Sequence, residues 1–296
     1  MLPVYVSLVL DDPAAPDALR AAARQLLADP ATTAPIDQLI ADAHRHMPTD
    51  DDHRWHMLYI DAAILKVLAR MSTDADEGST RECIATLDRA IIVAGAATDD
   101  SRRDHVVHDI IHRLQSVLPA QPPTAVLNAL PDPVPPLCTS ANAVRVLSAL
   151  PSVVSAQKAW SRAPFVLREF ARDWPAVHQW ASLSYLFSAA GPGRIVPIEV
   201  GNDYRSDDWS QTLIAWDDFL ASLSSPDQHL YLAQYSLFAQ FPKLRDDIVI
   251  PDIVYAALDA PAYHPPQDVI LNAWLGPKGT VSPAHTASGY LFSSST

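Results

Sequence analysis

The chain is poor in cysteine and glycine, and each scarcity argues against a class of protein. Its 296 residues include two cysteines, Cys83 and Cys138, with no CxxC spacing between them. This argues against a disulfide scaffold or a zinc finger and suits a reducing compartment. Eight glycines leave little room for a phosphate-binding loop, and neither a GxSxG nor an HExxH motif occurs.

Basic residues and long apolar runs are also scarce. Lys and Arg number 21 against 34 for Asp and Glu, which gives a formal net charge of −13. Such a chain repels phosphate backbones, so direct nucleic-acid binding is not expected, and a basic protein partner suits the charge better. No apolar stretch reaches the ~18 residues that span a bilayer. The opening residues 1–12 lack the basic start of a signal peptide and predict a strand or a buried arm, so we expect a nuclear or cytoplasmic protein.

The first half has the composition of consecutive α-helices. Alanine and leucine are frequent from about Pro16 to Leu118, and Pro or Asp clusters separate the periodic segments. A run around Leu58 has the 3.6-residue period of a helix with a single apolar face, and another helix is expected to open near Ser79. Residues 1–118 are therefore predicted to form an α-helical domain. The run that defines the single apolar face is Trp55, Leu58, Tyr59, Ala62 and Leu65.

Proline marks the boundary between two parts of the chain. Seven prolines fall between residues 119 and 136, so residues 119–139 are predicted to form an extended linker. A helix is expected over residues 140–150, and residues 140–296 form the predicted second domain. Short strands are predicted there with helices at 184–190 and 215–223, which together indicate an antiparallel β-sandwich or barrel with helical insertions. The predicted strands are 163–167, 194–200, 229–234, 269–275 and one that begins at 281.

The second domain also carries a series of motifs in a fixed order. It opens with APFVLR at 163–168 and then DWPA at 173–176, and it closes with NAWLGP at 272–277 and GTVSPAH at 279–285. In this order and spacing the region resembles a JmjC-type, cupin-like Fe(II)/2-oxoglutarate oxygenase, in particular the arginyl-hydroxylase and lysine-demethylase-8 branch. The resemblance is close over about residues 160–285, and that branch also has a helical N-terminal region. It implies an α+β chain in which an all-α domain precedes an incomplete JmjC double-stranded β-helix.

The resemblance assigns one iron ligand to this chain, His285. The family holds iron with a His-x-Asp/Glu pair and a distal His, but the second position of the pair is Ala287 here, which has no lone pair to offer. The distal His and the 2-oxoglutarate-binding Lys of the family are expected beyond the last residue, and the tail 286–296 matches nothing in the family. We therefore expect a chain that is catalytically incompetent through truncation and does not bind Fe(II) and 2-oxoglutarate productively.

Five further positions match ligand-contacting residues of the family. Tyr231 and Gln234 are three apart on one strand, so they face opposite sides unless a bulge intervenes. Trp274 lies in an apolar strand and is also a typical core residue, while Lys278 is expected to be a solvated surface charge. The positions matched to 2-oxoglutarate contacts are Tyr231 and Ser282, and those matched to the substrate side are Tyr204, Gln234 and Trp274.

A row of histidines lies outside the resemblance. His105, His108, Asp109 and His112 share one face of a predicted helix, opposite its apolar face, so the histidines are expected to be exposed. Such a row chelates a transition metal weakly, but a solvated polar face is the simpler interpretation.

Two functions remain open at this point. One is a protein oxygenase that hydroxylates or demethylates a basic residue, of which this chain is an incomplete version. The other is a non-catalytic interaction scaffold that uses the helical domain.

Overall fold

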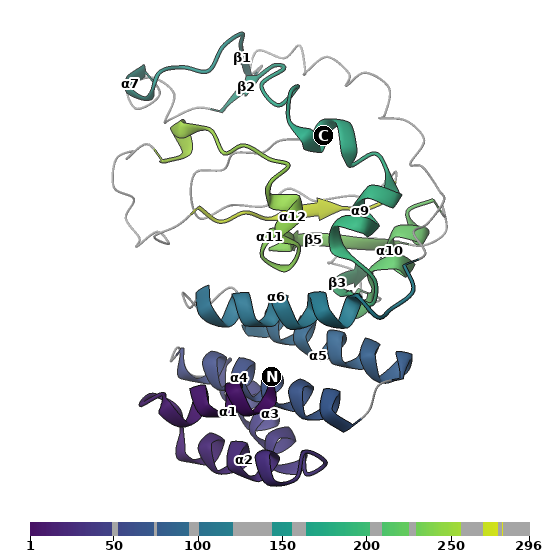
Figure 1. Cartoon of the computed structure of the whole chain (residues 1–296). Coiled ribbons are helices and arrows are strands. Elements are labelled where there is room, and N and C mark those ends of the chain that lie inside the picture. Colours follow the sequence, from purple (N-terminus) through teal and green to yellow (C-terminus); the bar gives the residue numbers. More distant parts are fainter. Residues whose placement is uncertain are drawn as a thin grey trace.

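A computed structural model describes residues 1–48, 53–73, 76–94, 101–120, 144–155, 164–201, 209–224, 229–255, 269–277 and 280. The first half is helical, and the second half is built on a β-sheet with short helices (Figure 1). Helices α5 (Glu77–Ala94) and α6 (Ser101–Gln115) lie between the other helices of the first half and the sheet. The α+β class predicted from the sequence is confirmed.

Helix α4 (Arg54–Thr73) is the centre of the helical half. Every residue from Leu58 to Leu65 is buried, so the prediction of a single apolar face is wrong. The reason is that α4 packs against helices on several sides and joins them in one apolar core. The helices around it are α1 (Leu2–Asp11), α2 (Asp17–Ala28), α3 (Ala34–His46), α5 and α6.

The opening residues form helix α1, so the alternative of a strand is wrong, whereas the buried arm is observed in helical form. Its buried residues recur with helical spacing, and Pro3 occupies the first turn, where a missing N–H costs no hydrogen bond. A short apolar run does not distinguish a helix from a strand, because its periodicity is hidden when nearly every residue is apolar. The buried residues are Leu2, Tyr5, Val6 and Val9.

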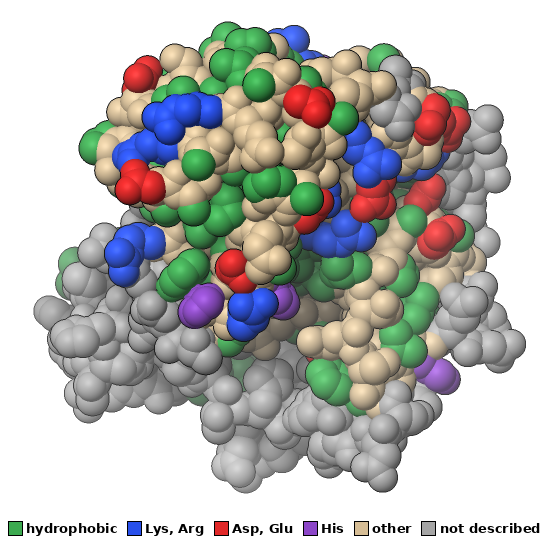
Figure 2. Space-filling view, turned by 90° about the horizontal axis from the view of Figure 1, so that it is seen from below, with side chains coloured by type: hydrophobic (Ala, Val, Ile, Leu, Met, Phe, Trp, Pro, Cys, Tyr) green, Lys and Arg blue, Asp and Glu red, His purple; other side chains and the backbone are tan. Residues whose placement is uncertain are grey.

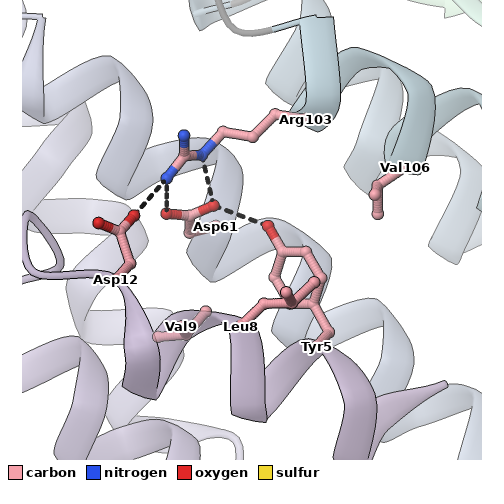
Figure 3. A pocket seen from close by; sticks show the side chains of 7 residues that line it. All are labelled: Tyr5, Leu8, Val9, Asp12, Asp61, Arg103 and Val106. Carbon is pink, nitrogen blue, oxygen red and sulfur yellow. Dashed lines mark hydrogen bonds and ion pairs between the residues drawn. The ribbon is translucent and has the colours of Figure 1, made fainter.

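A buried ion pair holds three of these helices together (Figure 3). The Arg103 guanidinium on α6 donates to both carboxylate oxygens of Asp61 on α4, at 2.8 and 2.9 Å. The Tyr5 hydroxyl on α1 donates to the same carboxylate at 2.7 Å, and Arg103 also lies 3.3 Å from Asp12. These groups line a small pocket, but they satisfy one another across it, so its role is structural.

Four described strands form an antiparallel sheet in the order β4, β3, β5, β6. Short helices pack on one face of the sheet and share a second apolar core with it, around Trp216 and Phe219. The strands are β3 (Ile195–Val200), β4 (Ser210–Ala215), β5 (Leu230–Tyr235) and β6 (Ala273–Leu275). The helices are α9 (Leu183–Ala190), α10 (Trp216–Ser222), α11 (Leu237–Gln240) and α12 (Pro242–Arg245), and α8 (Pro175–Gln179) precedes α9 in the chain.

The helix predicted over residues 140–150 is wrong. Within its described part the chain forms strand β1 (Arg145–Leu147), which pairs in parallel with β2 (Phe165–Leu167). Pairing with a partner 20 residues away is a tertiary effect that outweighs the local helix preference. The remaining elements are α7 (Val153–Ser155) and a 3-10 turn, η3 (Asp252–Tyr255).

The other predictions for the second half have mixed outcomes. The strands at 194–200 and 229–234 and the helices at 184–190 and 215–223 are confirmed within a residue or two, whereas only the last three residues of 269–275 are strand. Strand β4 was not predicted. The linker from residue 121 onward and the strand expected from 281 lie outside the described residues. None of the helices in the described ranges combines the length and apolar character that crossing a bilayer requires.

Candidate functional site: the open face of the sheet

The sheet has one covered face and one open face. Val196, Ile198 and Leu232 point into the apolar core shared with the short helices. Because side chains alternate along a strand, the residues between them project from the other face. Tyr231 and Glu199 are register partners on neighbouring strands, so they stand side by side on this second face. We call it the open face, since the short helices of the second core pack on the other side.

A β-bulge in β5 brings two predicted site residues to the open face. Leu232 pairs with Leu275 and Tyr235 pairs with Ala273, so β5 has one residue more than β6 between these pairs. Leu232 and Tyr235 both pack on the helix-covered side although they are three apart, which leaves Gln234 exposed and away from that core. Gln234 has a φ of 48°, the left-handed conformation that a bulge residue adopts.

Residues three apart on a regular strand face opposite sides, and the bulge allows Tyr231 and Gln234 to share one face. Trp274 lies opposite it on β6, between two residues of the covered face, and its side chain is 44% exposed. A core role for Trp274 is therefore not observed within the described residues. The backbone of Gly276 approaches Tyr231 so closely that a Cβ there would lie 2.9 Å from the Tyr231 ring. Tyr231, Gln234 and Trp274 thus form a group on the open face.

The remaining predicted site residues lie outside the described residues: Tyr204, Ser282, His285, Ala287 and the surface charge Lys278. Within the described part of the chain no group of three or more His, Cys, Asp or Glu side chains is placed to hold a metal ion.

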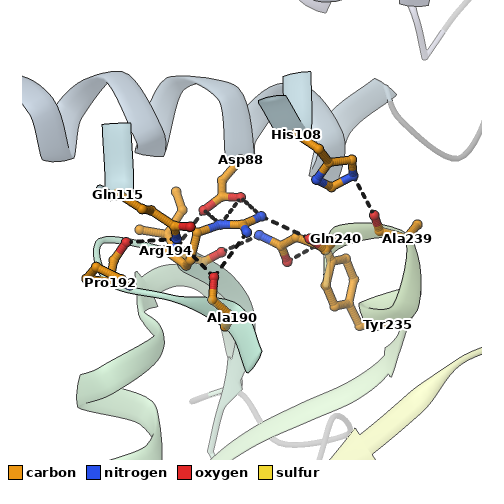
Figure 4. Close-up of polar contacts among 10 residues, drawn as sticks. Asp88, His108, Gln115, Ala190, Pro192, Arg194, Tyr235, Ala239 and Gln240 are labelled. Carbon is orange, nitrogen blue, oxygen red and sulfur yellow. Dashed lines mark hydrogen bonds and ion pairs between the residues drawn. The ribbon is translucent and has the colours of Figure 1, made fainter. Parts of the chain in front are cut away.

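A polar network behind the open face ties the sheet to the helical half (Figure 4). Asp88 on α5 is fully buried and accepts three hydrogen bonds from Arg194, of 2.6, 2.9 and 3.0 Å, and one of 2.9 Å from the Ile195 N–H. Arg194 precedes β3 and also donates to the Gln240 carbonyl at 3.0 Å. Its guanidinium lies 4.7 Å from the centre of the Phe241 ring. The carboxylate is thus paired and fully hydrogen-bonded, as a buried charge must be.

The turn between α9 and β3 docks against the same helices. Gln115 on α6 donates to the carbonyls of Ala190 and Pro192 at 2.9 and 3.1 Å. Gly191 and Gly193 both have a φ of 78°, and a Cβ on Gly193 would lie 3.1 Å from the side chains of Ile84 and Leu118. This close approach requires glycine.

His108 departs from the expected row of exposed histidines. His105, Asp109 and His112 are exposed, but His108 is partly buried and its Nε2 lies 3.1 Å from the Ala239 carbonyl on α11. Burial, together with the nearby Arg194 charge, lowers the pKa of His108. The shared helical face is therefore partly an interface to the sheet half.

Two aromatic residues that follow the DWPA motif have a structural role. Trp180, which follows the DWPA motif, donates from its indole N–H to Asp247 at 2.8 Å, and the Tyr185 hydroxyl donates to the same carboxylate at 2.8 Å. Burial raises the pKa of Tyr185 to about 12, and the hydrogen bond to Asp247 contributes to the rise. The carboxylate holds α8 and α9 against the segment after α12, behind the sheet.

Sequence reasoning missed the network of Asp88, Arg194 and Gln240. One local signal was present: Asp88 follows Leu87 and lies one helical turn from Ile84 and Ile91, within the buried stripe of α5. A carboxylate in such a stripe needs a buried partner, although nothing local identifies a partner 106 residues away.

The chain is similar in sequence to known cupin-like and JmjC-domain proteins. Residues 152–288 match the family model described as a cupin-like domain. The chain is 45% identical over 128 residues to Jumonji C domain-containing protein 5 of Drosophila melanogaster, which covers 41% of this chain and 31% of that protein. It is 31% identical over 255 residues to lysine-specific demethylase 8 of Danio rerio, which covers 80% of this chain and 59% of that protein. It is 42% identical over 126 residues to lysine-specific demethylase JMJ30 of Arabidopsis thaliana, which covers 41% of this chain and 28% of that protein.

The second half of the chain therefore matches the cupin-like domain and is similar to JmjC-domain proteins, and it is joined to a helical N-terminal half. Among JmjC proteins it resembles the lysine-specific demethylase 8 branch, as the motifs indicated. The chain spans 59% or less of the length of these three relatives.

Proposed function

We propose that the open face is the ligand-binding wall of a JmjC-type domain, of the class that hydroxylates or demethylates basic residues of proteins with Fe(II) and 2-oxoglutarate. The observation that carries the proposal is the bulge in β5. It brings Tyr231, Gln234 and Trp274 to one exposed face, and these are three of the positions that the resemblance matched to co-substrate and substrate contacts. Sequence similarity alone would not bring these three residues to one face of the sheet; the bulge does so.

The iron donors of the family do not fit this chain. His285 supplies one nitrogen, and the methyl group of Ala287 takes the place of the carboxylate that completes the His-x-Asp/Glu pair. A facial triad that lacks its anionic ligand loses both a donor and the charge that balances Fe(II). We therefore propose that this chain binds its ligands without catalysing a reaction on them.

The ligand that suits the open face is a basic protein segment. Glu199 stands beside Tyr231 on this face, and the whole chain carries a net charge of −13, so a Lys or Arg side chain would be attracted to it. The Tyr231 phenol is a hydrogen-bond donor for a carboxylate, which supports its assignment as a 2-oxoglutarate contact. The two cysteines without pairing spacing support a nuclear or cytoplasmic setting.

The proposal is tested with the full chain in two separate assays. Lys- and Arg-containing peptides are titrated against the wild type and Gln234→Ala under anaerobic conditions, and 2-oxoglutarate decarboxylation is measured in air with added Fe(II). We expect peptide binding that weakens in Gln234→Ala and at higher salt, with no iron-dependent decarboxylation. Binding that is unaffected by Gln234→Ala would remove the open face from the proposal.

A second candidate is a scaffold that binds a partner through the helical half. The observation that favours it is the outer side of α1, where Val4 is 68% exposed and Leu8 is 38% exposed. On the face seen in Figure 2, acidic and basic side chains are interspersed with apolar ones, so this face offers no block of a single charge among its described residues. Partner capture by the full chain that is lost in Val4→Glu and kept in Gln234→Ala would favour this candidate.

A further inference from the structure

We propose that Asp88 in the helical half is a positioning residue for the β5 bulge, and through it for the edge of the open face. The two sites are linked by Arg194, Gln240 and Tyr235. That the bulge borders a ligand-binding wall rests on the proposed function, whereas the coupling itself does not.

The first link is the buried charge pair. Asp88 is 0% exposed and Arg194 is 4% exposed, so water does not replace either partner if the other is lost. Three hydrogen bonds from Arg194 to one carboxylate fix the plane of the guanidinium. The plane in turn directs Nη2 towards the Gln240 carbonyl.

The second link is Gln240, the last residue of α11. Its backbone carbonyl accepts from Arg194, while its fully buried side chain donates from Nε2 to the Ile195 carbonyl at 2.7 Å. Its Oε1 accepts a 2.8 Å hydrogen bond from the Tyr235 hydroxyl. Both ends of the amide are therefore used, which allows one orientation of the side chain.

The third link is Tyr235, which directly follows the bulge residue. Its pairing with Ala273 is where the register of β5 resumes after the extra residue. The left-handed φ of Gln234 is a strained conformation for a residue other than glycine, and such a conformation persists when its neighbours over-determine it. The bond from Tyr235 to Gln240 supplies that constraint on the helix-covered side of the sheet.

Losing the Asp88 charge should therefore loosen the bulge before it unfolds the protein. Without the carboxylate, the Arg194 guanidinium must turn to its remaining acceptors, the carbonyls of Gln240 and Ala190. This displaces Gln240 and releases Tyr235. The expected effect is local, confined to residues 230–241.

Amide hydrogen exchange of the full chain tests this coupling without any ligand. Asp88→Asn retains the size of the side chain and removes its charge. The matched control is Asp61→Asn, which removes the charge from the other buried Asp–Arg pair and lies wholly within the helical half. Tyr235→Phe is a second variant that removes one hydroxyl and leaves both ion pairs in place.

In Asp88→Asn we expect exchange over residues 230–241 to be faster by about tenfold, with residues 54–73 unchanged. Tyr235→Phe should show the same selective change, and Asp61→Asn should accelerate exchange in α4 and leave 230–241 as in the wild type. Equal acceleration of 230–241 in Asp88→Asn and Asp61→Asn would overturn the proposal. If Asp88→Asn does not fold, the test rests on Tyr235→Phe. Unchanged exchange of residues 230–241 in that variant would overturn the proposal. Failure of the peptide titration would leave these exchange results intact, so the two proposals fail separately.

Discussion

The Asp88 carboxylate on helix α5 and the Arg194 guanidinium at the start of β3 form a fully buried ion pair between the helical half and the sheet half. A pair of this kind is costly to desolvate, and it contributes stability only while both partners are present and fully hydrogen-bonded. The pair therefore stabilises the contact between the two halves.

The first prediction concerns this pair. Asp88→Ala leaves an unpaired buried guanidinium and should lower the free energy of unfolding by about 3–5 kcal/mol, measured by urea denaturation. The double variant Asp88→Leu with Arg194→Met removes both charges and should lose clearly less than Asp88→Ala alone. A double variant that is as unstable as the single one would show that the unpaired charge is not the cause.

The second prediction concerns the docking turn. Gly193→Ala should cost about 1–3 kcal/mol, because alanine is strained at a φ of 78° and its methyl group meets Ile84 and Leu118. Gly78→Ala in the first turn of α5 is the control. Helix propensity favours alanine there by about 1 kcal/mol, although its Cβ would lie 3.2 Å from Asp76 Oδ1, so we expect a smaller loss than at Gly193. Thermal melts of both variants test this prediction. Equal losses of stability in the two variants would argue against the close contact of Gly193 with Ile84 and Leu118.

The third prediction follows from the lowered pKa of His108. A lowered folded-state pKa means that the unfolded chain binds the proton more readily, so stability is complete above the unfolded value of about 6.5 and falls as pH drops through the folded value. Urea midpoints between pH 7.5 and 5 should therefore decline less steeply in His108→Gln than in the wild type. His112→Gln, an exposed position on the same helix, should keep the wild-type slope. Parallel slopes for His108→Gln and the wild type would contradict the assignment.

The fourth prediction concerns separation of the halves. Residues 155–296 alone should be poorly soluble, because Arg194 loses its carboxylate and the face of the docking turn that meets Ile84 and Leu118 becomes exposed. Adding residues 1–118 in trans should recover part of the soluble material. A monomeric fragment that melts cooperatively by itself would contradict this view.

Local patterns predicted much of the fold. The helices of the first half and strands β3 and β5 were found because their periodicity and turn residues are properties of short segments. Helix α1 and strand β1 were misassigned where the segment is short and its conformation is set by packing partners. The Asp88–Arg194 pair joins positions 106 residues apart, and periodicity carries no information about such a partner.

The candidate site, too, was predicted from the sequence only in part. The motifs identified Tyr231, Gln234 and Trp274 as ligand contacts, which stays a prediction, and the bulge supplies the geometry that this prediction requires. The alternation rule alone placed Tyr231 and Gln234 on opposite faces. One inserted residue reverses that result, and its presence depends on register with β6, which a single strand does not reveal.

The fifth prediction concerns Fe(II), whose binding is measured by anaerobic equilibrium dialysis against the full chain and against Ala287→Asp. We expect no stoichiometric iron in the wild type, since Ala287 replaces the acidic ligand, and tighter binding in Ala287→Asp, which restores the His-x-Asp pair. A wild-type chain that holds one iron per molecule, and that decarboxylates 2-oxoglutarate once air is admitted, would contradict this expectation.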